Sequence, residues 1–340
     1  MSRTNEKLPL VSFCLMSCRQ KELIREAFAA ALAQDYENLE IIVSDDNSQD
    51  GTWEIVQKMA CEYKGPHKVI ISRNEINLGI IGNWQKLCSL ASGEIFVKAD
   101  GDDISYPNRA RVIAEDWVNS GKRAVVMASS YDKMDVDGHL IGELLLPGGW
   151  DKRTTEQIAN GNGYFYIGAT FACHRSIYDD FQPVTHPKAS DGASFEARGL
   201  LSRRGLDIDG TIFHPFRTIR EKLVRYRVGT GVTTGGAYRK FMTKGIHRCL
   251  ENRLQALDDL TTTAKAYLPN SYYKELLDIY NNSVENLKNE VQLWEGDNFK
   301  VRWEAYRKLK RSGGNFKVAM IKRLLLLPKW LSDAIFAVFR

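Results

Sequence analysis

Two short runs of the sequence crowd carboxylates directly behind apolar stretches. Asp45 and Asp46 end the run LEIIVSDD, and Asp100, Asp102 and Asp103 follow the run EIFVKA. Carboxylates this close together repel one another unless a positive group lies among them. Such a set of oxygens can bind a hard divalent cation, accept hydrogen bonds from ligand hydroxyl or N–H groups, or supply a base. The simpler alternative is a pair of solvated turns that only end two strands.

The elements that must position these residues alternate between strands and helices over the first 135 residues. The runs LVSFCLMS, LEIIVSDD, KVIISRN and GEIFVKAD are typical of buried strands, and the stretches between them place apolar residues on one helical face. This alternation predicts an α/β fold with a mostly parallel sheet flanked by helices. Ligands bind beyond the carboxyl ends of such strands, so both acidic runs should face one crevice.

The remaining chain is less regular and then becomes helical. Glycines are frequent between Gly142 and Gly168, which predicts loops over the crevice, and YIGATFACHR and EKLVRYRVG are typical of strands. The run SDGASFEARGLLSRRG predicts a helix, and beyond Gly236 the pattern is helical. We therefore expect a helical C-terminal appendage behind the α/β domain.

Charge and cysteine content exclude several classes. The net charge of +5 over 340 residues hides eleven Lys and Arg against two acidic residues from Lys300 onward, so the rest of the chain is mildly acidic and nucleic-acid binding is not expected. The six cysteines form no CxxC pair and the histidines are scattered, which argues against zinc. No apolar run reaches the length of a membrane-spanning helix and no secretory signal core is evident, so we expect a cytoplasmic protein.

The order of the motifs supports a more specific interpretation. VSFCLMS, QDYENLEIIVSDDNSQDGT, NEINLGIIGNW and ASGEIFVKADGDDISYPNR together resemble the nucleotide-sugar domain of family 2 glycosyltransferases of the bacterial surface-polysaccharide type, which have the GT-A fold. The resemblance implies a GT-A domain at residues 1–235, with a nucleotide-sugar half at 8–135 and an acceptor half at 136–235. Residues 236–340 would form the helical C-terminal region with a basic amphipathic tail.

The resemblance also implies roles at the donor site. Asp46, with Asp45 beside it, should meet the base of the nucleotide, and Ser17 and Asn77 should belong to the same nucleotide-binding surface. Asp100 should face the ribose. The nucleotide expected is UDP, with dTDP as an open alternative.

The second acidic run resembles the metal-binding element of the family. Asp102, together with Asp100, should bind Mn²⁺ or Mg²⁺ through the diphosphate, and Asp103 should brace the loop. Where the family often has a histidine after Tyr-Arg-Val, this chain has Gly229. Arg227 is therefore the expected cationic contact of the diphosphate.

The acceptor side resembles the family less closely. In ASDGASFEAR, Asp191 corresponds to the residue that deprotonates the acceptor hydroxyl, although Ser190 replaces the usual Glu. A helix N-cap is the structural alternative for Asp191. Glu196 is the alternative base, and His214 could substitute for the missing histidine near the metal.

Together these features predict an inverting, metal-dependent glycosyltransferase at the inner face of the cell membrane. It would move a sugar from a UDP-sugar or dTDP-sugar to a hydroxyl of a growing, lipid-linked surface glycan such as an O-antigen or capsule unit. A dinucleotide-dependent oxidoreductase lacks its glycine fingerprint here. A catalytically silent sugar- or lipid-binding scaffold of the same fold stays open.

The basic C-terminal segment has two interpretations. KVAMIKRLLLLPKWLSDAIFAVFR combines basic residues with an apolar stripe after Pro328. Such a helix can lie in the interface of an anionic membrane, with its basic residues reaching the head groups. Alternatively, it can dock on the core of the protein itself.

Overall fold

The computed structural model describes residues 8–159, 167–186, 191–205, 215–230, 238–311, 325–328, 331 and 335. Within these residues the strands form one sheet in the order β3-β2-β1-β4-β9-β6-β10-β5, with β7 paired to β6 and β8 to β10. The strands are β1 (Val11–Ser17), β2 (Leu39–Asp45), β3 (Lys68–Arg73), β4 (Ile95–Asp100), β5 (Ile104–Ser105), β6 (Val126–Met134), β7 (Leu140–Leu144), β8 (Gly149–Trp150), β9 (Phe171–His174) and β10 (Phe216–Arg227).

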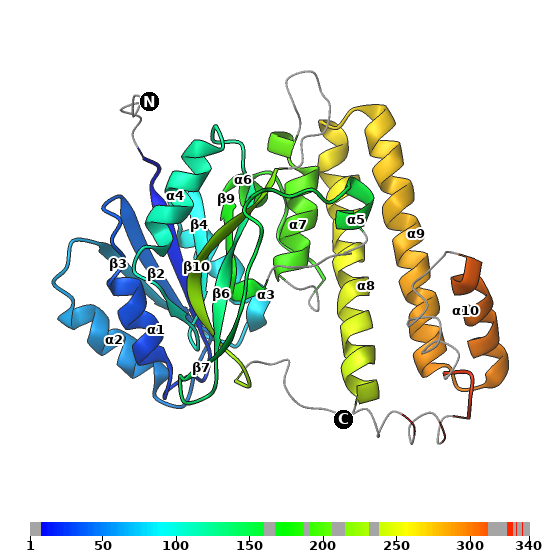
Figure 1. The fold of residues 1–340 in the computed structure, drawn as a ribbon, viewed down its shortest axis with the longest axis horizontal. Helices are drawn as coiled ribbons and strands as arrows, with labels where there is room; N and C mark the ends of the chain where they lie inside the picture. Colours follow the sequence, from blue (N-terminus) through cyan, green and yellow to red (C-terminus); the bar gives the residue numbers. More distant parts are fainter. Residues whose placement is uncertain are drawn as a thin grey trace.

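Helices cover both faces of this sheet and then continue beyond it (Figure 1). The α-helices are α1 (Ile24–Leu32), α2 (Thr52–Glu62), α3 (Gly79–Leu90), α4 (Arg109–Asn119), α5 (Thr155–Ala159), α6 (Ser176–Asp179), α7 (Asp191–Leu201), α8 (Tyr238–Thr262), α9 (Asn270–Glu295) and α10 (Phe299–Arg311). Short 3₁₀ turns lie at Gly168–Thr170, Arg203–Gly205 and Ala264–Ala266.

Side-chain alternation along β1 divides the core into two layers. Phe13 and Leu15 pack with residues of α1, α2 and α4 on one face of the sheet. Cys14 and Met16 point to the other face and join a cluster that includes residues of α3 and α7. Every residue of β1 is buried and most are apolar, as expected for the centre of a doubly covered sheet, while the buried Ser12 and Ser17 hydroxyls donate to Glu40 and Asp45.

The sheet confirms the predicted α/β class; its longest ladders are parallel, while β5, β7, β8 and β9 pair antiparallel with their neighbours. β3, β2, β1 and β4 run parallel, and β10 runs parallel to β6. β9 is antiparallel to both β4 and β6. The strand predicted over YIGATFACHR is shorter, because Gly168–Thr170 forms a 3₁₀ turn before β9. The strand predicted over EKLVRYRVG begins earlier, at Phe216, because Phe216 to Ile219 also pair with β6.

The helical appendage shares its core with the α/β part. One apolar cluster includes Phe195 of α7, Leu260 of α8 and Leu276 of α9. A separate cluster joins α10 to α9 and α8 and also contains Leu325. The boundary predicted between residues 235 and 236 stays a prediction. Among the described residues, the helices fall short of the length and apolar character needed to cross a membrane.

Candidate active site

Strand register brings the two acidic runs to one edge of the sheet. In the parallel ladders Ser17 pairs with Asp45, and Met16 pairs with Asp100. The carboxyl ends of β2, β1 and β4 therefore finish side by side. Gly101 lets the second turn lie close, because a Cβ there would meet the side chain of Gln20 and lie 3.0 Å from the carbonyl oxygen of Met16.

The first acidic turn, defined here as Asp45 and Asp46, is buried. Asp45 Oδ2 accepts a hydrogen bond from the Ser48 N–H at 2.9 Å, and Asp45 Oδ1 accepts one from the Ser17 hydroxyl at 3.3 Å. Arg73 Nε lies 3.7 Å from the same carboxylate. Asp45 and Ser17 thus hold the β2–α2 loop against the end of β1.

The Asp46 carboxylate is also occupied by hydrogen-bond donors of the protein. Its carboxylate accepts hydrogen bonds from the N–H groups of Leu78 and Gly79, both at 2.8 Å, and from Asn74 Nδ2 at 2.9 Å. These N–H groups belong to the start of α3, where an anion is stabilised by unpaired backbone donors. Asn77 joins the same loop by donating to the Asp46 carbonyl at 3.1 Å. The contacts of Asp46 and Asn77 with a nucleotide stay predictions.

The second acidic turn, Asp100 to Asp103, is less satisfied. The Asp100 side chain is 27% exposed and its Oδ1 accepts from the buried Lys98 ammonium. Asp102 Oδ2 accepts from the Thr230 hydroxyl at 2.9 Å. Burial and the charge of Asp100 raise the pKa of Asp102. These two carboxylates form a negative site in which an added cation would be stabilised.

Asp103 and Arg227 hold the second acidic turn in place through hydrogen bonds. Asp103 is buried, and its carboxylate accepts from the Arg227 backbone N–H at 2.7 Å. Burial, Asp100 and Asp102 raise the pKa of Asp103 well above its usual value. The Arg227 guanidinium donates to the carbonyls of Asp102 at 3.0 Å and Val136 at 2.8 Å. Its contact with a diphosphate stays a prediction, and the observed partners give it a bracing role.

Two buried cations beside the second turn escaped the sequence analysis. Lys98 lies within β4 and pairs with Asp100. Arg109, at the start of α4, donates to the Lys98 carbonyl at 2.7 Å and the Ala169 carbonyl at 2.8 Å. Burial lowers the pKa of Arg109 to about 10, although Asp100 and Asp103 oppose that shift. The signal for Lys98 was a lysine inside an otherwise apolar strand next to an aspartate.

The predicted bases lie on α7. Asp191 is the first residue of α7, but its side chain falls outside the described part of the chain, as does the whole of His214. Glu196 is buried in an ion pair with Arg153, which also pairs with Asp151 at 2.7 Å. Burial raises the pKa of Glu196 and Arg153 opposes that shift. The role of base stays a prediction for both acids.

A further acidic group lies in the turn between β6 and β7. One ligand atom from each of Asp135, Asp137 and His139 lies within 4.8 Å of the others, a spacing that could hold a metal ion. Asp135 Oδ1 accepts from the N–H groups of Asp137 at 3.0 Å and His139 at 2.9 Å, and these hydrogen bonds account for the turn. The sequence analysis did not select these residues.

Comparison with known proteins identifies the family of the α/β part. The family model described as Glycosyl transferase family 2 matches residues 12–181. The putative glycosyltransferase EpsE of Bacillus subtilis is 33% identical over 101 residues, which is 30% of this chain and 36% of EpsE. The abequosyltransferase RfbV of Salmonella typhimurium is 37% identical over 113 residues, 33% of each chain. The matches thus span about a third of these curated relatives.

Solved structures extend the likeness to almost the whole chain. Staphylococcus aureus TarS 1–349 in complex with UDP-GlcNAc superposes with a TM-score of 0.55 at 15% identity, covering 96% of this chain and 89% of TarS. This likeness includes the helical appendage and supports the predicted fold. With half of its length matched by the family model, the chain belongs to glycosyl transferase family 2, a family of transferase enzymes.

Proposed function

We propose that the protein transfers a sugar from a UDP-sugar to a hydroxyl of a surface glycan, with a divalent cation and inversion at the anomeric carbon. The carrying observation is the contrast at one sheet edge. Asp45 and Asp46 are occupied by N–H and O–H donors and by Arg73, whereas Asp102 accepts from the Thr230 hydroxyl and lies beside Asp100, whose single cationic partner in the described residues is Lys98. A carboxylate pair at the end of β4 fits the hard-oxygen ligation of Mn²⁺ or Mg²⁺.

In this proposal each residue of the second turn has a separate task. Asp100 and Asp102 would hold the cation, which when bound would neutralise the negative charge of the departing diphosphate. Lys98 fixes one oxygen of Asp100, and Thr230 fixes Asp102 Oδ2. Asp103 and Arg227 keep the turn in place through the 2.7 Å hydrogen bond to the Arg227 N–H.

The base would be Asp191. It would accept the proton of the acceptor hydroxyl while the acceptor oxygen bonds to the anomeric carbon and the bond from that carbon to the diphosphate oxygen breaks. A single in-line displacement inverts the configuration. Glu196 is less suited to this task, because its carboxylate is buried and occupied by Arg153.

The names of similar proteins support the donor and acceptor classes. TarS was solved with UDP-GlcNAc. The Escherichia coli protein WfaP, 31% identical over 96 residues, 28% of this chain and 36% of WfaP, is named a UDP-Glc:α-D-GlcNAc-diphosphoundecaprenol β-1,3-glucosyltransferase. We therefore infer a UDP-sugar donor, with dTDP as the open alternative, and a lipid-linked glycan acceptor at the inner face of the membrane.

Differential thermal stability tests the donor site. UDP should raise the melting temperature in Mn²⁺ or Mg²⁺ but not in excess chelator, because Asp100 and Asp102 repel a diphosphate without the cation. Neither condition should stabilise an Asp102→Asn protein. Equal stabilisation with chelator would remove the cation from the proposal, and stabilisation by NAD⁺ instead would favour an oxidoreductase.

Transfer kinetics test the base. Asp191→Asn should lower turnover by about two to four orders of magnitude, the usual range for loss of a general base, while the UDP affinity stays unchanged. Glu196→Gln should lower the melting temperature, because it breaks a buried ion pair with Arg153. An active Asp191→Asn protein beside an inactive, folded Glu196→Gln protein would move the base to Glu196.

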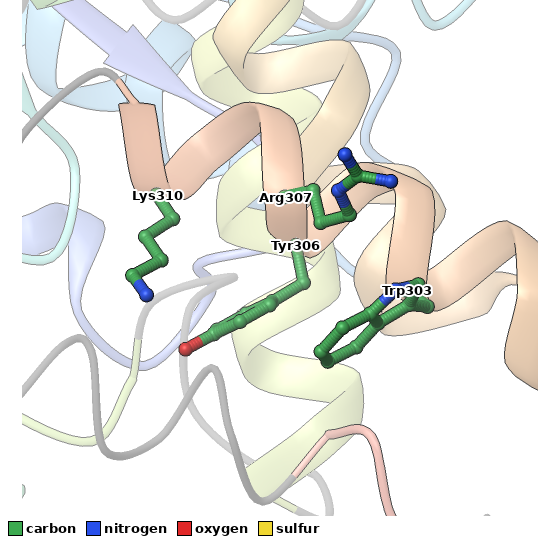
Figure 2. Close-up of a pocket in the computed structure, with 4 residues that line it drawn as sticks. All are labelled: Trp303, Tyr306, Arg307 and Lys310. Atoms are coloured by element: carbon green, nitrogen blue, oxygen red, sulfur yellow. The ribbon is translucent and has the colours of Figure 1, made fainter.

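Contact with a membrane is the last part of the proposal, and α10 supports it. Phe299 and Trp303 are 57% and 42% exposed, and Phe299, Trp303 and Tyr306 stack in a row. Figure 2 shows Trp303, Tyr306 and Lys310 projecting to one side of α10, where they and Arg307 line a hollow of about 420 Å³. Exposed aromatic rings beside basic residues are typical of surfaces that meet an anionic lipid interface.

The predicted tail itself is mostly outside the described residues. Its residues Leu325 and Leu327 contribute carbonyls that accept from Arg302 of α10, both at 2.8 Å, and Leu325 is fully buried. This part of the tail docks on the protein, whereas the alternative interpretation for the apolar stripe after Pro328 stays a prediction. Deleting the tail would therefore damage the core around α10, and substitutions on α10 make a cleaner test.

Vesicle co-sedimentation can separate charge from burial. Phe299→Ser with Trp303→Ser should release the protein from vesicles containing phosphatidylglycerol. Arg307→Glu with Lys310→Glu should also release it, and the loss of binding should be larger at low salt than at high salt, because salt screens the attraction to the lipid charge. Lys58→Glu with Lys64→Glu, at exposed positions on α2 and just after its end, is the matched control. Retained binding by both α10 variants would remove α10 from the membrane contact.

A further inference from the structure

Helix α8 of the appendage holds the segment that leads into α7. Gln255 is fully buried, and its Oε1 accepts from the backbone N–H groups of Thr185 at 2.7 Å and His186 at 3.1 Å. One turn earlier on α8, Glu251 lies 3.2 Å from His186 Nδ1. The chain is therefore fixed five residues before Asp191, by side chains that belong to the helical appendage.

The same face of α8 also holds the far side of α7. Asp259 accepts from Arg198 Nε at 2.8 Å and Nη2 at 3.0 Å, and both side chains are almost fully buried. Gln255 Nε2 donates to Asp259 Oδ1 at 3.1 Å, so the two contacts form one network. Arg198 Nη2 also donates to the Gln182 carbonyl at 2.6 Å. This network, Gln182–His186 with Arg198, Gln255 and Asp259, is called the α8 clamp below.

The first half of α7 is placed beside the nucleotide half of the protein. Phe195, four residues after the start of α7, has its ring 5.9 Å from the ring of Trp84 in α3. Trp84 lies five residues after Gly79, whose N–H holds Asp46. The Trp84–Phe195 contact therefore joins α7 to α3, and the α8 clamp contacts the chain at His186 before Asp191 and at Arg198 after it. Figure 1 shows α7 lying between the sheet and α8.

From this arrangement we infer that the appendage is a working part of the acceptor site, and that Gln255 is a positioning residue for the base at Asp191. The inference rests on the proposed function. A buried ion pair or a packed leucine would suffice to attach one helix to another. Gln255 instead uses both ends of its amide: Oε1 accepts from the Thr185 and His186 N–H groups, and Nε2 donates to Asp259. Loss of part of this network would leave buried polar groups unpaired.

The test is Gln255→Met, which keeps side-chain length and removes the hydrogen bonds. Turnover should fall about ten- to a hundredfold, because small misplacement of a catalytic group costs that much. The UDP dissociation constant in Mn²⁺ should stay within twofold, since the β2 and β4 ends are untouched. Leu276→Ala, in the α9 part of the same core, is the matched control for lost stability. Equal loss of turnover in the control at an equal drop in melting temperature would overturn the inference.

A double-mutant cycle separates this inference from the proposed function. In an Asp191→Asn background, Gln255→Met should change the residual rate by less than twofold, because both substitutions act through the same base. Multiplicative losses would overturn the positioning role while leaving Asp191 as base. A fully active Asp191→Asn protein would instead overturn the proposed base itself. Glu251→Gln, at a partly exposed site, repeats the cycle should Gln255→Met fold poorly.

Discussion

The two acidic turns at the sheet edge have similar sequences and opposite physical states. The carboxylates of Asp45 and Asp46 accept hydrogen bonds from donors in the loop and at the start of α3, so both are stabilised by partners within the protein. Asp102 and Asp103 have raised pKa values because they are buried near one another and near Asp100. From this difference we expect the first acidic turn to support the site and the second to receive the ligand of the proposed function.

The largest expected effect comes from the second turn. Asp102→Asn should reduce transfer at least about a hundredfold, because it removes an anionic ligand for the cation at the point where charge develops. The melting temperature without cation should not fall, since the amide still accepts from Thr230 and one repulsive charge is gone. Near-normal turnover would contradict the comparison of the two turns.

The first turn should respond in stability. Asp46→Ala leaves the N–H groups of Leu78 and Gly79 without their acceptor and removes one of the two acceptors of the Asn74 amide, which keeps Asn83 Oδ1. We expect a loss of about 3 kcal/mol in the free energy of unfolding, in the range for unpaired buried donors, with weaker UDP binding as a consequence. Urea unfolding measures it. An unchanged stability together with lost UDP binding would instead indicate that Asp46 contacts the base directly.

The pH dependence of the free energy of unfolding should reveal the raised pKa of Asp103 in the second acidic turn. The pKa of Asp103 is raised in the folded state, so the metal-free protein should lose stability as pH rises from about 4, where the unfolded carboxyl ionises, through the higher folded pKa. Asp103→Asn removes this loss and can still accept from the Arg227 N–H. The variant's advantage in chelator should grow with pH and then level off. Parallel curves for variant and wild type would contradict the assignment.

The smallest expected effect lies at the rim of the second turn. Glu26 Oε2 lies 3.0 Å from Arg227 Nη2, but the Glu26 side chain is 60% exposed. Glu26→Gln should change the free energy of unfolding by less than about 0.5 kcal/mol, as for most exposed ion pairs. A larger loss, measured by the same urea titration, would show that the bracing of Arg227 depends on this contact rather than on the backbone carbonyls.

The sequence by itself indicates the longer strands, the α/β class and the edge where the acidic residues meet, but not the short strands β5, β7 and β8 or the strand order. Apolar runs such as VSFCLMS and LEIIVSD are buried at every position, a pattern that a local reading of hydrophobicity detects. The order of motifs such as SDDNSQDGT and ADGDD also resembles that of family 2 glycosyltransferases, and some contacts in these loops are local in sequence, such as Ser48 with Asp45.

Only the tertiary structure decided which carboxylates are free to act. The Asp46 carboxylate is hydrogen-bonded by donors 28 to 33 residues away, and Asp103 accepts from the backbone N–H of Arg227, 124 residues away. Lys98 and Arg109 reach the second turn because β4 and the start of α4 converge there. The α8 clamp joins Gln255 to Thr185 across 70 residues. Hydrogen bonds and burial act through space, so no spacing in the sequence specifies these partners.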